Sequence, residues 1–296
     1  MARGVPGNAL FLAFAIALSA LGGGCSFAPV NELKVFRESV TTANGAATPI
    51  LDELTSTVRS ETRRTTEGVE KSKYRIGAAV QFETSQAQYF TDIGDPSSVA
   101  MFRKAHALLD KLSQVLLDLA TGTNAAADAG AVEGLASELL QFAAFVPAVD
   151  TAAAAAGLEA LKPLLEQLSR ELGRRQVRQA IDTMEKQKVV ERIIDRLIKA
   201  TPPMFDNLVQ AAQLQAAKQQ SEATTTAYQN RVARIRLVLS NYVVLLGRVN
   251  DAWLEAVKAE KSQTSGNAAM LTERVSELRA AALATRKSFA DMNAAR

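Results

Sequence analysis

Apolar residues separated alternately by three and four positions are the feature that most constrains the fold of this chain. A spacing that averages 3.5 residues places side chains along one stripe of an α-helix, as in the seam of a left-handed coiled coil. Because only a short polar loop, 262–267, separates two such segments, we predict an antiparallel helical hairpin. The first seam comprises Val232, Ile235, Leu239, Tyr242, Leu246, Val249 and Trp253, and the second comprises Leu271, Val275, Leu278, Ala282, Thr285, Phe289 and Met292.

The composition extends this prediction to the whole chain. The 296 residues are rich in alanine and contain only 16 glycines and 8 prolines. Alanine, leucine and the long charged residues are strong helix formers, because they lose little side-chain freedom in a helix. Segments that alternate β-branched and polar residues are nearly absent. We therefore predict an all-α protein, an elongated bundle of long antiparallel helices that are partly coiled coil.

Helix start and stop signals divide the first third of the chain. A helix is expected over 31–43, ending at Asn44-Gly45. Thr48 is a candidate N-cap and Pro49 a first helical residue, which predicts a second helix from Pro49 to about Asp92. The turn residues Gly94-Asp95-Pro96 then restart a helix that runs to about Ala120.

The second half of the chain divides less sharply. The Ala/Gly/Asn-rich segment 121–134 is the best internal boundary within a bundle that we place at 31–296. The apolar segment 135–156 is interpreted as a buried helical hairpin bent at Pro147. A helix over 158–200 should end at Thr201, the expected cap of one helix over 202–262.

Two polar, Thr-rich intervals lie inside the expected long helices, at 55–73 and 215–230. Few apolar residues are available there to hold a helix by packing. We hypothesise that the two intervals lie at the same height of the bundle and form a mobile or partner-facing zone.

The first 24 residues have the layout of a cleaved secretory signal peptide. Arg3 gives a positive n-region, and Ala9–Leu21 is an apolar h-region interrupted only by Ser19. Such a segment is too short to cross a hydrocarbon core of about 30 Å. Small residues, Gly22 to Gly24, lead to Cys25, the only cysteine of the chain.

This segment resembles the signal peptide of bacterial lipoproteins, whose lipobox is an apolar residue, two small residues and a cysteine. Leu21 lies four residues before Cys25, and Gly22 occupies the place three before it, where the family usually has leucine. The resemblance implies that Cys25 is the lipidation site, carrying diacylglycerol and a further acyl chain such as palmitate, and becomes the mature N-terminus. Residues 25–30 would then be a lipidated spacer. Ser26, being other than Asp, implies sorting to the outer membrane, facing the periplasm.

Three other interpretations of Cys25 and its apolar segment remain open. Cys25 is a free thiol after cleavage by an ordinary signal peptidase, although no good A-x-A site is visible nearby. The h-region stays as an uncleaved membrane anchor, or it is a buried helix of the fold. None of these assigns a covalent role to the single cysteine, which in any case excludes a disulfide within the chain.

The residues that would carry enzymatic chemistry are missing from the sequence. His106 is the only histidine, and it lies near the apolar stripe of its helix, so it is expected to be structural or at the surface. No His/Cys metal cluster, phosphate-binding loop or dinucleotide motif is present. The net charge of +3 is spread over both signs, which is weak evidence for a nucleic-acid partner. We predict no catalytic residues, no metal, no cofactor, no nucleic acid and no small-molecule substrate.

The sequence therefore favours a lipid-anchored envelope protein that acts as a non-enzymatic helical scaffold or interaction module. Its expected partners are the membrane, through the lipid on Cys25, and another envelope protein or a second copy of the chain. The alternative is a membrane-active protein that resembles the α-helical pore-forming toxins and uses the apolar hairpin 135–156. An efflux-channel subunit does not fit, because no strand-patterned segments exist to build its barrel.

Overall fold

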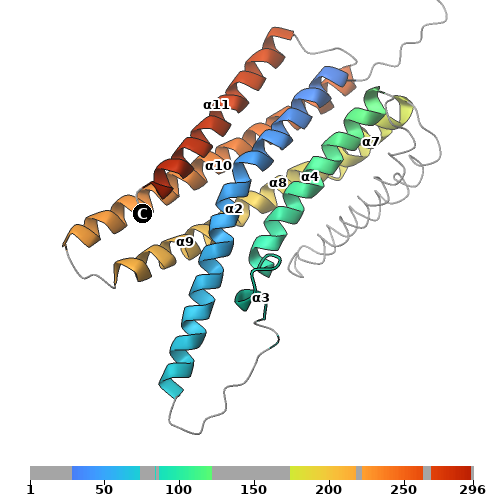
Figure 1. The fold of residues 1–296 in the computed structure, drawn as a ribbon. Helices are drawn as coiled ribbons and strands as arrows, with labels where there is room; N and C mark the ends of the chain where they lie inside the picture. The colour runs from blue at the N-terminus through green and yellow to red at the C-terminus, as the bar shows by residue number, and fades with distance from the viewer. Residues whose placement is uncertain are drawn as a thin grey trace, which may run out of the picture.

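A computed structural model of the chain describes residues 29–73, 84, 87–121, 174–217, 222–262 and 268–294. Within these ranges every regular element is a helix, which confirms the predicted all-α class. The helices form an elongated bundle (Figure 1). They are α2 (Val30–Lys73), α3 (Ala87–Phe90), α4 (Ser97–Thr121), α7 (Arg174–Lys186), α8 (Val189–Lys199), α9 (Thr201–Ala216), α10 (Glu222–Ser262) and α11 (Ala268–Asn293).

The expected break at Asn44-Gly45 is wrong, because α2 continues through it and through Pro49. A proline inside a helix costs about 3 kcal/mol, since it lacks an N–H group and its ring crowds the preceding turn. Three buried side chains just beyond it, Ile50, Leu51 and Leu54, are each at most 3% exposed. Full burial of such a side chain contributes roughly 1.5–3 kcal/mol, so packing outweighs the cost of the proline.

The turn before α4 is confirmed. Gly94 has a φ of 72°, a left-handed conformation that glycine adopts without strain. The Pro96 carbonyl accepts hydrogen bonds from the amides of Val99 and Ala100, which starts α4. The predicted apolar stripe of α4 is buried throughout, namely Val99, Phe102, Leu109, Leu112, Leu116 and Leu119.

The helix expected to end at Ala200 is divided within the described residues. Lys188 has a φ of 51° and separates α7 from α8. No glycine or proline at this position predicts the break. Thr201 was expected to cap the next helix, but its hydroxyl donates backwards to the Leu197 carbonyl at 3.1 Å. Pro202 and Pro203 follow it without N–H groups, and the next amide, that of Met204, donates to the Ala200 carbonyl at 3.4 Å.

The single helix expected over 202–262 is also wrong. α9 ends at Ala216 and α10 begins at Glu222, and the two helices fold back against each other (Figure 1). This reversal lets Met204, Leu208 and Ala212 of α9 bury against the bundle. In one continuous helix these side chains would have stayed far from the strict seam of α10.

The predicted antiparallel hairpin of α10 and α11 is confirmed, with its register fixed by polar pairs. Arg234 donates to the Asp291 carbonyl, Asn241 contacts Ala284 and Ser288, and Arg248 pairs with Glu277. Steps of seven residues along α10 are matched by steps of seven back along α11, which is the register of an antiparallel coiled coil.

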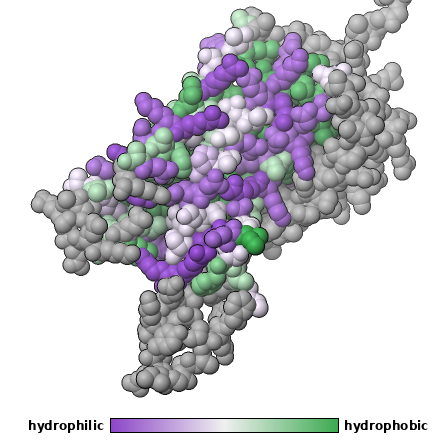
Figure 2. Space-filling view, viewed as in Figure 1, coloured by the Kyte–Doolittle hydropathy of each residue, from purple (hydrophilic) through white to green (hydrophobic). Residues whose placement is uncertain are grey.

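The hydrophobic core lies where α2, α4 and α7 to α9 meet the buried seam of α10. Phe36 of α2 packs against Trp253 of α10 with ring centroids 5.5 Å apart, and both side chains are fully buried. Six of the seven predicted seam residues of α10 are buried, and Val232 is half-buried. On the face shown in Figure 2, hydrophilic side chains are interspersed with smaller apolar areas.

The described parts of the two Thr-rich intervals do not lie side by side. α2 and α10 meet where Glu53 lies 3.8 Å from Arg231. Beyond this pair the end of α2 and the start of α10 diverge towards different corners of the molecule (Figure 1). The sub-boundary at 121–134, the apolar segment 135–156 and the seam before Arg174 lie outside the described residues.

Candidate functional site

Cys25, the one residue to which the sequence assigns chemistry, lies outside the described residues, which begin at Pro29. Its lipidation stays a prediction. α2 begins at Val30, so the helical body starts within a few residues of this cysteine.

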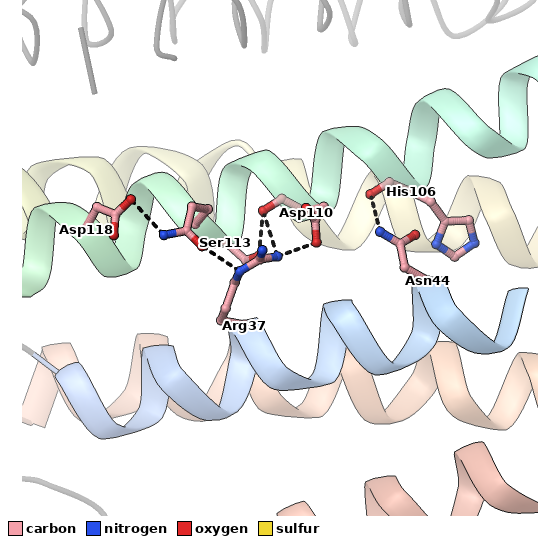
Figure 3. A network of polar contacts seen from close by, with 7 residues as sticks. Arg37, Asn44, His106, Asp110, Ser113 and Asp118 are labelled. Atoms are coloured by element: carbon pink, nitrogen blue, oxygen red, sulfur yellow. Dashed lines mark hydrogen bonds and ion pairs between the residues drawn. The ribbon is translucent and has the colours of Figure 1, made fainter. Parts of the chain in front are cut away.

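Polar side chains between α2 and α4 form a hydrogen-bonded network (Figure 3). Arg37 of α2 points at α4, where its guanidinium pairs with the Asp110 carboxylate and donates to the Asp110 carbonyl. It also donates to Gln114 Oε1 at 2.9 Å, and Gln114 in turn donates to Asp118. Because the network is half-buried, its charges are partly shielded from water and fix the register of α2 against α4.

A buried hydrogen bond joins α4 to α10 close to this network. His106 Nε2 lies 2.8 Å from the hydroxyl of Tyr242, and the two residues are 4% and 1% exposed. Burial lowers the pKa of His106 to about 4 and raises the pKa of Tyr242. Both groups are therefore neutral at pH 7, because burial disfavours the charged form of each.

A hollow of about 280 Å³ opens at the surface beside this pair, between α2 and α4. Its walls combine polar and apolar groups: Asn44, Gly45, Ala47, Thr48, Leu51, Arg103, His106 and Ala107. Asn44 donates to the His106 carbonyl across a long 3.5 Å contact (Figure 3). Arg103 is held at the rim by Asp52 at 2.6 Å and by Asp95 at 2.8 Å.

Arginines of α2 also hold the turn that leads into α4. Arg59 donates to the carbonyls of Ile93 and Gly94, and Arg63 donates to the Tyr89 carbonyl and pairs with Asp92. The turn is thereby fixed with the Ile93 side chain 85% exposed. This arrangement fixes backbone groups and leaves no cluster of reactive side chains.

A second buried carboxylate lies near the end of α10. Glu260 is 2% exposed and pairs with Arg178 of α7 at 3.5 Å, while its Oε2 has no hydrogen-bond partner among the residues that the structure describes. Burial raises the pKa of Glu260, Arg178 lowers it, and Asp182 raises it. The pair ties α7 to α10 at the same end of the bundle as Trp253.

Metal binding finds no support in the described ranges, where no group of three or more His, Cys, Asp or Glu side chains is close enough to hold an ion. Among the same residues, no helix is both long and apolar enough to span a membrane. Comparison with known proteins adds nothing to the site, because no family model, curated protein or solved structure matches the chain.

The sequence did not reveal the two polar networks. His106 was assigned a structural or surface position, and it is buried and bonded to Tyr242. One signal was available: Tyr242 occupies a seam position, and a buried tyrosine hydroxyl needs a partner. Arg37 carried no comparable signal, because its pattern is that of an ordinary solvated helix face.

Proposed function

We propose that this chain is a lipid-anchored bacterial envelope protein and that its helical body is a non-enzymatic scaffold or interaction module. The acyl chains on Cys25 would bury CH₂ groups in one leaflet at about 0.8 kcal/mol each, and more than one chain makes such anchoring stable. The anchor would place the body at the outer membrane, facing the periplasm. The observation that carries the proposal is the cysteine that directly follows an apolar h-region and small residues.

The start of α2 supports a defined orientation on the membrane. Val30 is five residues after Cys25, and five residues span at most about 17 Å when fully extended. The end of the bundle that holds the start of α2 also holds the end of α10 and the start of α11 (Figure 1). This end would face the lipid. The 44 residues of α2 would then carry the opposite end roughly 66 Å away.

The surface of the body supports a scaffold. Ion pairs across the bundle join α11 to α2 through Arg279 and Glu38 at 2.6 Å, and α10 to α7 through Lys261 and Glu185 at 2.6 Å. Exposed pairs of this kind contribute little each, about 0–1 kcal/mol, and the buried core keeps the faces of the long helices in fixed positions. Such faces are suited to contacts with another envelope protein or a second copy.

Metabolic labelling with an alkyne fatty acid tests the anchor. The full chain should be labelled, its processing should be blocked by globomycin, and Cys25→Ser should abolish both. Ser26→Ala is the matched control and should be labelled normally. Ser26→Asp should be labelled but should move to the inner membrane. Membrane-held, normally processed Cys25→Ser protein would contradict the proposal.

Cross-linking in intact cells followed by purification tests the scaffold. The full-length protein should capture an envelope protein or its own copy, and Cys25→Ser, released from the membrane, should capture less. A fully anchored protein that captures neither would count against the scaffold while leaving the anchor intact.

A further inference from the structure

The hollow beside His106 contains a hydrogen-bonding group that the fold does not use. His106 has two ring nitrogens, and only Nε2 has a partner among the described residues, the Tyr242 hydroxyl at 2.8 Å. His106 is one of the residues that line the hollow. Nδ1 is therefore the ring nitrogen left for a molecule that enters it.

Hydrogen-bond satisfaction decides what Nδ1 offers. The Tyr242 hydroxyl is 99% buried with its residue and has no other partner in the described part of the chain, so its proton goes to His106 Nε2. The opposite arrangement would leave a hydroxyl proton buried and unpaired, which costs about 1–3 kcal/mol. A neutral imidazole that accepts at Nε2 carries its proton at Nδ1. His106 thus presents an Nδ1–H donor to the hollow.

Asn44 presents the complementary acceptor. Its Nδ2 donates to the His106 carbonyl, and because a carbonyl only accepts, this contact fixes which end of the amide is nitrogen. Its Oδ1 has no partner among the described residues, and Asn44 lines the same hollow as His106. The apolar lining between these groups comes from Ala47, Leu51 and Ala107.

One of the two arginines at the hollow is already neutralised by carboxylates. Arg103 is already paired with two carboxylates, those of Asp52 and Asp95. Arg286 of α11 reaches over Gly45, with Nη2 2.8 Å from where a β-carbon would lie. A glycine at this position leaves room for that side chain at the rim, where it offers a further donor.

We propose that this hollow binds a secondary amide that carries a small apolar group, such as a peptide bond next to alanine or the acetamido group of an amino sugar. The amide carbonyl accepts from His106 Nδ1–H, the amide N–H donates to Asn44 Oδ1, and the methyl group packs on Ala47 and Ala107. The site is independent of the lipid on Cys25 and of the scaffold function.

The single histidine makes the site directly observable. The full chain, labelled with ¹⁵N-histidine and held in detergent micelles, should give one imidazole spin system with the proton on Nδ1. N-acetylglucosamine, N-acetylalanine methylamide or both should shift these signals in a saturable way, and the stronger probe identifies the source. Glucose and acetate lack the N–H and should leave the signals unchanged.

Substitutions in the wall separate binding from folding. Ala107→Phe, which fills the hollow from an exposed position, should abolish the response while the His106 signals keep their Nδ1–H pattern. Ala233→Phe, at an exposed alanine of α10, is the matched control and should respond as the unmodified chain. Asn44→Ala keeps a good helix former and should weaken the apparent affinity about ten-fold, the effect of one hydrogen bond.

Three results would overturn the site. The first is a histidine with its proton on Nε2, because Nδ1 would then accept. The second is the absence of any saturable shift with either amide up to its solubility. The third is a response to acetate that equals the response to the amides, which would make the hollow an anion site of Arg286.

Discussion

At the scale of single residues, the pair His106–Tyr242 shows where prediction from sequence stops. The helical spacing places Tyr242 on a buried seam and His106 beside a buried stripe, so the burial of both is accessible to sequence reasoning. Their contact is not, because the two residues are 136 positions apart and meet only through the relative rotation of α4 and α10. The same holds for Arg37 and Asp110, which come from different helices.

Removing the tyrosine hydroxyl should lower stability measurably. Tyr242→Phe leaves His106 Nε2 buried without a partner, and we expect the free energy of unfolding to fall by about 1–3 kcal/mol in urea titrations. Tyr228→Phe is the matched control on the same helix, at a half-buried position, and should change stability by less than about 0.5 kcal/mol. Equal losses of stability for the two substitutions would show that the buried hydrogen bond between Tyr242 and His106 does not stabilise the fold.

The depressed pKa of His106 predicts acid sensitivity. The ordinary pKa of histidine is 6.5, and the pKa of His106 in the folded chain is about 4. Between pH 6.5 and pH 4 the unfolded chain therefore has a protonated His106, whereas the folded chain has a neutral one. The free energy of unfolding is therefore unaffected by this group above pH 6.5, and it falls by roughly 3 kcal/mol in total as the pH is lowered to 4.

The measurement compares urea midpoints between pH 7.5 and 4 for the unmodified chain and for His106→Gln, whose amide can still accept from Tyr242. The difference in stability between the two should shrink or reverse on acidification. Parallel pH profiles would contradict a buried neutral histidine.

At the scale of elements, local signals gave the right helix class and some wrong boundaries. Asn44, Gly45 and Pro49 predict a break by propensity, yet buried side chains on either side hold α2 continuous. Conversely, the break at Lys188 carries no propensity signal. In both cases tertiary packing, which is not visible in a local window, decides the outcome.

The proline inside α2 and the proline just before α4 should change stability in opposite directions when they are replaced. Pro49→Ala restores a donor inside α2 and should raise the free energy of unfolding by about 2 kcal/mol, the helix penalty less the entropy that proline removes from the unfolded chain. Pro96→Ala, just outside α4, has no helix penalty to relieve and should lower it by about 0.4–1 kcal/mol. A loss of stability on Pro49→Ala would mean that α2 requires the proline.

At the scale of the whole molecule, the seams predicted helix pairing but not all of the partners. The hairpin of α10 and α11 follows from two adjacent seams and a short loop. The packing of α2 against α10 and α11 does not, because a coiled-coil seam serves contacts within and between chains equally well. The packing of α9 against α10 could not be predicted for the same reason, because a seam does not identify the helix that covers it.

Two leucines of α10 distinguish the core from the surface. Leu246 is fully buried and Leu237 is 54% exposed. Leu246→Ala should cost about 2–5 kcal/mol, because it removes buried surface and leaves a cavity, whereas Leu237→Ala should cost less than about 1 kcal/mol. Fluorescence of Trp253, the single tryptophan, follows unfolding in both variants. A large loss for Leu237→Ala would place that residue in a covered interface.

The contact of α2 with α11 also sets when the bundle can be completed during synthesis of the chain. Glu38 pairs with Arg279, 241 positions later, so the first helix completes its packing only when the last one is present. A ribosome adds roughly 5–20 residues per second, and about 220 residues separate the ends of α2 and α11, a delay of roughly 10–45 s. During this interval α2 can pack against α4, but its surface towards α10 and α11 stays uncovered, so the bundle is completed only when its final helix is made.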